Sequence, residues 1–261
     1  MHQCEPKIFV LAETMSCTKD VQDFLMHMGA PDWATDCPSD VEGLCELIGR
    51  VCYKSFDVGL NANLTSVRKG NHAYITNVIK QRHGSVFEHT WATFALADVS
   101  RVFTHEVVRH RVGTGISQES LRFVRVDDVG VWLPTSIAQN EQATALFTAL
   151  FVKAENTYAA LVDLFAKHDG DDSFHVKKTW TSAIRRVLPQ GMATNIIWST
   201  NMRNLRHVIE ARTHPGADEE IRMLFGEVGR IARLRWPNLF CDYTVEMVDG
   251  HPWYRTENQK I

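Results

Sequence analysis

The chain has 261 residues, of which 44% are hydrophobic and 23% are charged, and its formal net charge is −3. Such a composition is typical of a globular protein with an ordinary buried core. The slightly acidic balance argues against a dedicated nucleic-acid-binding protein, which usually carries a basic surplus. Because no run of about 18 apolar residues is present, no membrane span is expected.

The N-terminal segment and the cysteines indicate a cytoplasmic protein. The first residues lack a basic stretch followed by a long apolar one, so no secretory signal is expected. The six cysteines contain no Cys-x-x-Cys pair. They indicate reduced thiols and neither a zinc site nor a disulfide framework.

The N-terminal half of the chain predicts two strands and two helices. Residues 6–13 are apolar and β-branched after a proline, as in a first strand. Residues 39–56 predict a helix with Ser39 as its N-cap. Residues 86–100 are strand-like, and residues 100–111 predict a helix that stops near Gly113.

The C-terminal half is richer in helices. After a strand or extended loop over 123–134, residues 139–167 have the clearest helical periodicity of the chain. Further predicted elements are a helix from Phe174 until Pro189 ends it, a strand over 194–200, and helices over 201–212 and 218–235. Strands interleaved with long helices indicate a mixed α and β fold, and this pattern does not give the strand order.

The segment 104–125 concentrates positive charge beside small hydroxyl residues. Arg109 and Arg111 are two apart and cannot share a helix face, so a helix that serves one site with both must end there. Gly113 and Gly115 supply the backbone freedom for that. A flexible loop is expected after Gly113, and its donors, together with guanidinium groups, suit a phosphate: Thr114, Ser117, Gln118, Ser120 and Arg122. A solvated basic loop is the alternative.

Three ordered segments resemble the flavin-dependent thymidylate synthase family. They are "RHGSVFEHTWATF" at 82–94, "RHRVGTGISQESLRF" at 109–123 and "IRRVLPQGMATNIIWSTNMRNLRHVIEAR" at 184–212. The resemblance is strongest over 41–240, and it implies a single domain over 1–261. The implied fold class is α/β (α+β), with a mixed, largely antiparallel sheet flanked by long helices.

The resemblance also implies an activity. Members of this family are methyltransferases that make dTMP from dUMP, with 5,10-methylenetetrahydrofolate as carbon donor and NADPH-reduced FAD as hydride source. They are typically homotetramers whose active sites are shared between subunits. Nucleic acid and membranes are not expected as partners, and no metal is expected.

The family's site residues carry over to matching positions of this sequence. For the flavin, these are His83, Ser85, Arg109, His110, Arg111, Gln118, Asn201, Met202, Arg203 and His207. For the nucleotide, they are Glu106, Arg109, Gln118, Ser120, Leu121, Arg122, Arg185 and Arg212. Arg212 matches the arginine that the family places against the pyrimidine, where it favours ionisation at N3, and it is expected to be catalytic.

The sequence departs from the family pattern in places that concern the substrate. Eight residues, 112–119, separate Arg111 from Ser120, where the family has seven. Glu106 stands where many members carry a glutamine. A related flavoenzyme that hydroxymethylates or otherwise alkylates a pyrimidine nucleotide is therefore one alternative. A catalytically silent flavin- or nucleotide-binding protein is the other.

Overall fold

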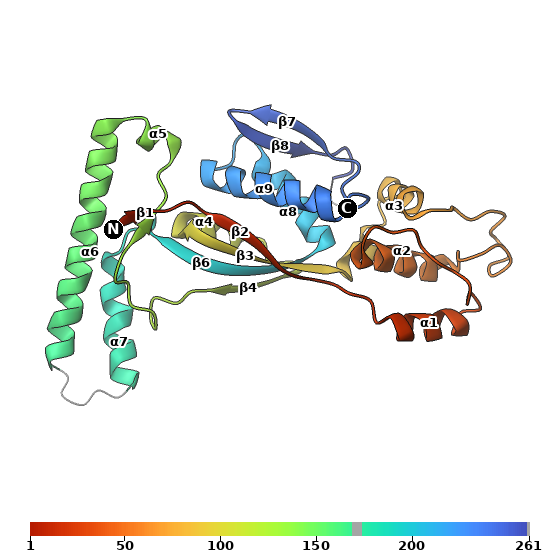
Figure 1. Ribbon diagram of the computed structural model, residues 1–261, viewed down its shortest axis with the longest axis horizontal. Coiled ribbons are helices and arrows are strands. Elements are labelled where there is room, and N and C mark those ends of the chain that lie inside the picture. The colour runs from red at the N-terminus through yellow and green to blue at the C-terminus, as the bar shows by residue number, and fades with distance from the viewer. Residues whose placement is uncertain (169–173, 260–261) are drawn as a thin grey trace. The chain divides into compact units, whose positions relative to one another are not determined.

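The computed structural model describes residues 1–168 and 174–259 (Figure 1). The chain divides into two compact units. The first unit consists of Met1–Phe9, Ala95–His110 and Ile116–Trp198, and the second unit holds the rest of the described chain. The single-domain expectation stays a prediction, and each unit is described by itself below.

A four-stranded sheet has the order β2-β3-β6-β4. Its strands are β2 (Lys7–Glu13), β3 (Trp91–Ser100), β4 (Thr114–Gln118) and β6 (Ala193–Asn201), and each has residues in both units. The strands predicted over 6–13 and 194–200 are confirmed. The strand predicted over 86–100 begins only at Trp91, because the residues before it form the 3-10 helix η1 (Gly84–Glu88).

Strand β4 corrects the prediction of a flexible loop after Gly113. Glycines and hydroxyl residues give this segment a poor local propensity for strand. Pairing with β6 at the edge of the sheet overrides that propensity. Only the residues on either side of β4 remain irregular.

The first unit contains α4 (Arg101–Val107), α5 (Thr135–Ala138), α6 (Glu141–His168), α7 (Phe174–Ile184) and the 3-10 helix η2 (Arg185–Val187). The strands β1 (His2–Gln3) and β5 (Gly130–Val131) pair in parallel. Helices α6 and α7 lie side by side (Figure 1), because Tyr158 packs against Trp180 and Ile184. The helices predicted over 139–167 and from Phe174 are confirmed.

The second unit contains α1 (Thr18–His27), α2 (Asp40–Tyr53), α3 (Asn71–Lys80), α8 (Met202–Thr213), α9 (Glu219–Arg235), β7 (Thr244–Val248) and β8 (His251–Arg255). Helix α2 packs against α3, and α8 packs against α9. Strands β7 and β8 form an antiparallel hairpin that covers α8 and α9. The mixed α+β class with antiparallel strand pairing is confirmed.

Side-chain caps mark the starts of the predicted helices. The Ser39 hydroxyl accepts a hydrogen bond from the Glu42 backbone N–H, and the Asn201 side chain accepts one from the Asn204 N–H. Asp218 caps α9 in the same way. Such caps satisfy N–H groups that have no partner inside the helix, which explains why these boundaries could be predicted.

A buried ion pair stabilises the second unit. Arg206 on α8 is 1% exposed, and its two terminal nitrogens each donate to a carboxylate oxygen of Asp242 over 2.8 Å. Thr256 and Asn258 donate to the same carboxylate. Burial alone would raise the pKa of Asp242, but these hydrogen bonds and the charge of Arg206 outweigh it and lower that pKa.

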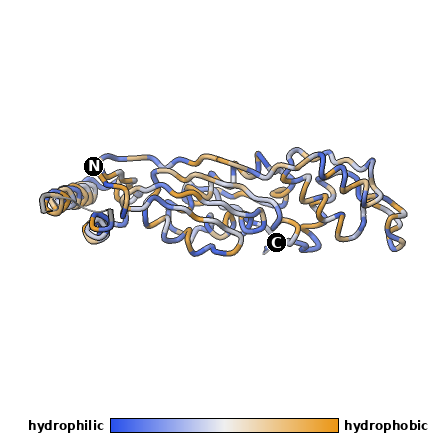
Figure 2. The backbone as a smooth tube through the Cα atoms, turned by 90° about the horizontal axis from the view of Figure 1, so that it is seen from below, coloured by the Kyte–Doolittle hydropathy of each residue, from blue (hydrophilic) through white to orange (hydrophobic). Residues whose placement is uncertain are grey.

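Hydrophobic residues are distributed in short stretches along the whole chain. In Figure 2 they alternate with hydrophilic residues within most elements. Within 1–168 and 174–259, no helix has both the length and the hydropathy needed to cross a membrane.

Candidate functional site

The predicted Arg-His-Arg triplet lies just beyond the end of a helix. Helix α4 starts at a Ser100 cap and ends at Val107, and the N–H groups of Arg109 and His110 close a turn onto the carbonyls of Glu106 and Val107. The expectation that Arg111 lies outside the helix is confirmed, but the helix ends six residues before the predicted stop near Gly113. The helix spans about two turns and buries Phe103, Thr104 and Val107.

A glycine brings the segment after the triplet against the start of α8. Gly113 has φ +64°, and its carbonyl accepts a hydrogen bond of 3.0 Å from the Asn201 N–H. A β-carbon at this position would lie 2.3 Å from Nδ2 of Asn201, which is shorter than any real contact. Glycine is therefore required here, because it alone permits both this backbone conformation and this approach. The structure thus brings the Arg111–Gly113 segment next to Asn201 and Met202.

The 3-10 helix η1 joins the same region of the second unit. It packs against α8, and Glu88 at its end makes an ion pair with Arg203. The Met202 N–H donates to the Thr90 carbonyl over 2.9 Å. Five of the expected flavin residues are therefore gathered on two contacting elements: His83, Ser85, Asn201, Met202 and Arg203.

Helix α8 also carries His207 and Arg212, on different faces. Arg203 and His207 are four residues apart and share one face. Arg212 is five residues beyond His207, which places it roughly 140° further around the helix axis. Arg212 is half-buried near the helix C-terminus. The structure therefore brings His207 together with the flavin group of residues, and it does not place Arg212 on that face.

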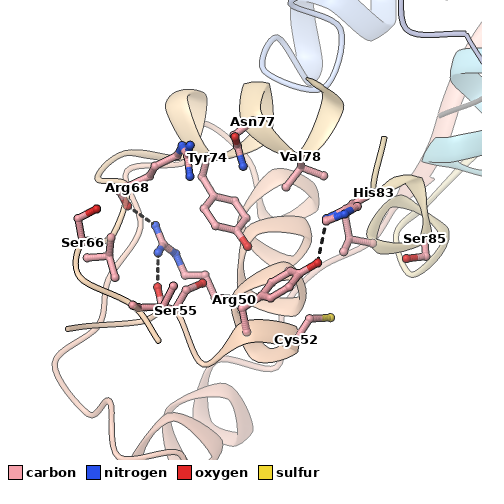
Figure 3. Close-up of a pocket in the computed structure, with 15 residues that line it drawn as sticks. Arg50, Cys52, Ser55, Ser66, Arg68, Tyr74, Asn77, Val78, His83 and Ser85 are labelled. Atoms are coloured by element: carbon pink, nitrogen blue, oxygen red, sulfur yellow. Dashed lines mark hydrogen bonds between the residues drawn. The ribbon is translucent and has the colours of Figure 1, made fainter. Parts of the chain in front are cut away.

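A cavity of about 360 Å³ opens beside η1 in the second unit (Figure 3). His83 and Ser85 line it, with Cys52 and Tyr53 from α2 and Tyr74 and Asn77 from α3. The rings of Tyr53 and His83 stack at 5.8 Å, and the Tyr53 hydroxyl lies 3.2 Å from Nδ1 of His83. We call this the η1 cavity.

Arg50 fixes the floor of the η1 cavity. Its side chain is 3% exposed, and its guanidinium group binds Glu46 and the carbonyls of Ser55 and Arg68, as Figure 3 shows in part. It also stacks on the Tyr74 ring at 4.4 Å. Because these contacts occupy its donors, Arg50 shapes the wall and leaves other groups to face a ligand. Those groups are the stacked Tyr53–His83 pair, several hydroxyls and the exposed Arg68.

Arg50 and Tyr53 could not be recognised as cavity residues from the sequence. A Glu46–Arg50 spacing of four residues is typical of an ion pair on a helix and does not distinguish a cavity wall. Tyr53 ends α2, and the left-handed backbone of Lys54 that follows it is visible only in the structure. The stacking partner of Tyr53, thirty residues away, depends on the tertiary fold.

The first unit groups the residues expected to bind the nucleotide phosphate. The Ser120 carbonyl accepts from the N–H groups of Phe123 and Val124 and so forms a turn. Arg122 lies on this turn, and its Nε donates to the Ser182 hydroxyl of α7 over 2.9 Å. Arg185 follows three residues after Ser182 in η2. Helix α7 therefore positions both arginines.

Leu121, Gln118 and Glu106 occupy different surroundings in that unit. Leu121 is buried in an apolar cluster with Val129 and Phe151, so its side chain anchors the turn to the core. Gln118 ends β4, and its Nε2 is buried without a hydrogen-bond partner in the described structure. Glu106 is half-buried on α4. Of these three, Gln118 has the clearest capacity to bind a ligand.

Comparisons with known proteins identify the family of this chain. A family model described as thymidylate synthase complementing protein matches residues 35–238. The flavin-dependent thymidylate synthase of Corynebacterium aurimucosum is 35% identical over 223 residues, which cover 84% of this chain and 87% of that protein. The enzyme so named from Corynebacterium glutamicum is 34% identical over 222 residues, covering 84% and 86%. The one from Mycobacterium bovis is 33% identical over 231 residues, covering 87% and 89%. The chain therefore belongs to the family of the thymidylate synthase complementing proteins.

Proposed function

We propose that this protein is a flavin-dependent thymidylate synthase. It would methylate dUMP reductively to dTMP, with 5,10-methylenetetrahydrofolate as carbon donor and NADPH as reductant of its FAD. The observation that carries this proposal is the family match over 35–238, which includes every residue assigned to the site. The relatives of similar length named as flavin-dependent thymidylate synthases support it.

The residues present fit a flavin. The η1 cavity of about 360 Å³ has an aromatic wall in the Tyr53–His83 stack and polar groups in Ser85 and Arg68. A planar ring with polar edges suits such a lining. Bound FAD would supply the hydride chemistry that amino-acid side chains lack. The residues proposed to hold it are His83, Ser85, Arg109, His110, Arg111, Gln118, Asn201, Met202, Arg203 and His207.

The nucleotide would be held by charge and hydrogen bonds. Ser120, Arg122 and Arg185 are proposed to bind its phosphate, because guanidinium groups form paired hydrogen bonds with phosphate oxygens. Glu106, Arg109, Gln118 and Leu121 are proposed to complete the site. The hydrogen bond from Arg122 to Ser182 supports this grouping, because Ser182 comes three residues before Arg185.

Arg212 is proposed to hold the negative charge that develops on the pyrimidine. An arginine remains protonated at any physiological pH, so it stabilises an anionic ring without having to exchange a proton. Its half-buried position strengthens such an interaction relative to bulk water. No nucleophilic cysteine is needed in this scheme. We further propose a cytoplasmic homotetramer, each chain a single domain, with active sites that neighbouring subunits complete.

The product of the reaction decides between the proposal and its alternatives. The purified protein is expected to be yellow and to convert dUMP anaerobically in the presence of FAD, NADPH and methylenetetrahydrofolate. Mass spectrometry should give the mass of dTMP. A product heavier by one oxygen indicates hydroxymethylation, and flavin binding without turnover of any pyrimidine indicates a silent binding protein. Arg212→Ala should abolish turnover and leave FAD binding intact.

A further inference from the structure

A second cavity, of about 180 Å³, lies in the first unit, and residues of β1, β5 and the start of β6 contribute to its wall. Four carboxylates line it: Asp98, Glu119, Asp127 and Asp128. We call it the acidic cavity. None of its polar side chains has a role in the proposed function. Carboxylates repel a phosphate group, so this cavity suits neither the nucleotide nor the flavin diphosphate.

Asn195 on β6 fixes two of the acidic segments. Its Oδ1 accepts a hydrogen bond from the Asp98 N–H over 3.2 Å, and its Nδ2 donates to Oε2 of Glu119 over 2.9 Å. The Glu119 N–H also donates to the Asn195 carbonyl over 3.0 Å. The fold therefore holds the backbone of Asp98 and the carboxylate of Glu119 against the same amide side chain.

The carboxylates differ in how their charge is compensated. Asp128 is paired, because one of its oxygens lies 2.7 Å from Nδ1 of His2 and the other lies 2.8 Å from the Met1 amine. Glu119 accepts from the amide of Asn195, which is a neutral donor. The negative charge of Glu119 is therefore left uncompensated by that contact.

Asp98 and Asp127 have less still. Within residues 1–168 and 174–259, no hydrogen bond or ion pair reaches either carboxylate. Arg125 also lines the cavity, but its guanidinium group lies over the Trp180 ring, 5.7 Å from the ring centre. The acidic cavity thus combines several uncompensated negative charges, which a cationic ligand would neutralise.

The hydroxyl of Thr194 is a further polar group at the acidic cavity. Thr194 lines the cavity and is 4% exposed, and its Oγ1 has no hydrogen-bond partner in the described structure. A buried polar group without a partner costs free energy, and a ligand that supplies the hydrogen bond recovers it. A hydroxyl oxygen and a carboxylate both accept hydrogen bonds, and an ammonium group only donates them.

The lining favours an organic cation over a metal ion. In the part of the chain that the structure describes, no three His, Cys, Asp or Glu side chains converge as metal ligands. Much of the remaining wall is apolar: Leu121, Val124, Val126, Val129 and Met192. Methylene groups pack against such side chains, as the stems of lysine and arginine do. A ligand with ammonium groups joined by methylene groups matches both parts of the wall.

We propose that the acidic cavity binds an aliphatic diamine. Its ammonium groups donate to the carboxylates of Asp98, Glu119 and Asp127 and to the hydroxyl of Thr194. Its methylene chain lies against the apolar part of the wall. This inference goes beyond the proposed function, because it concerns a separate site and requires neither flavin nor nucleotide.

Calorimetric titration of the full chain with 1,4-diaminobutane tests the charges. It is done at low salt, because salt screens exposed ion pairs. Asp98→Asn and Asp127→Asn should each raise the Kd about 5-fold, the upper value for a partly exposed ion pair. Asp163→Asn is the matched control, because it removes an exposed charge from α6 that does not line the cavity, and it should leave the Kd unchanged. Butylamine, with one ammonium group, should bind more weakly than the diamine by a similar factor.

Thr194→Val tests the unpartnered hydroxyl with little change of shape. Without the diamine, this variant should be at least as stable to heat as the wild type, because it removes a buried polar group that has no partner. With the diamine, its Kd should rise about as much as that of Asp127→Asn. An unchanged Kd for Thr194→Val would show that the hydroxyl does not contact the ligand and would overturn the proposed binding mode.

The remaining outcomes refute the site as a whole. Absence of diamine binding to the wild type refutes it, and so do equal Kd values for the Asp98, Asp127 and Asp163 variants, since the attraction would then be unspecific. Tighter binding of Mg²⁺ than of the diamine at equal ionic strength would assign the cavity to a metal ion. Asp127 is exposed, so Asp127→Asn decides the question even if Asp98→Asn does not fold. No turnover is measured, so a failure to convert dUMP leaves these results unaffected.

Discussion

Replacement of Gly113 by alanine tests the close approach that links the Arg-His-Arg segment to α8. The new β-carbon would meet Nδ2 of Asn201 at 2.3 Å and its Cγ at 2.8 Å, in a backbone with φ +64°. A left-handed conformation costs a residue with a β-carbon about 1–2 kcal/mol. Displacing the Asn201 side chain also removes the cap of α8, which costs about 1 kcal/mol. Gly113→Ala should therefore destabilise the protein by roughly 2–3 kcal/mol.

Gly115 provides the matched control for this prediction. A β-carbon there meets only Cβ of Ser199 at 3.8 Å, which is an ordinary contact. Gly115→Ala should change the free energy of unfolding by less than about 0.5 kcal/mol. Urea unfolding followed by circular dichroism measures both variants, and a flavin titration should show weaker FAD binding for Gly113→Ala alone. Equal stability of the two variants would refute the argument from Asn201.

The remaining predictions concern buried charges and thiols. Asp242→Ala leaves the Arg206 guanidinium buried without its partner and should cost about 3–5 kcal/mol in urea unfolding, whereas Glu227→Ala, which breaks an exposed pair, should cost less than about 1 kcal/mol. Comparable losses in the two variants would contradict the burial argument. Because the pKa of Asp242 is lowered from its ordinary 3.8, its contribution should be complete above pH 3.8 and should disappear as pH falls through the lowered value. If the wild type stays more stable to unfolding than Asp242→Ala below the lowered pKa of Asp242, the linkage argument is wrong. Burial raises the pKa of the Cys45 thiol to about 12, so iodoacetamide at pH 8 should modify the exposed Cys17 and spare Cys45 in the native protein, as read by peptide mass spectrometry. Equal labelling of Cys17 and Cys45 would mean that the core around Cys45 opens readily to solvent.

Elements with strong periodicity and a capping side chain could be predicted from the sequence. Helices α2, α8 and α9 begin at Ser39, Asn201 and Asp218, and each buries one apolar stripe. Helices α1 and α3 lack a side-chain cap at Cys17 and Gly70, and they were missed. Strand β4 was missed because its existence depends on pairing with β6, to which the local sequence contributes little.

In the candidate site, too, local sequence motifs identify some residues, and only the fold brings the others together. Motif spacing identified Ser85, Asn201 and Arg203, and the fold places them on contacting elements. Tyr53 could not be identified from the sequence, because its stacking partner His83 is thirty residues further along the chain. Such a pair of residues is formed only by folding.

Cys52 is a site for covalent attachment of small molecules at the η1 cavity. Its sulfur is exposed, lies on the cavity wall and is weakly held by the Ile48 carbonyl at 3.4 Å (Figure 3). A small molecule attached there through a reversible disulfide would be confined beside the stacked rings of Tyr53 and His83. Screening a fragment collection by such tethering would select compounds for their fit to this cavity, even where their free affinity is too low to measure.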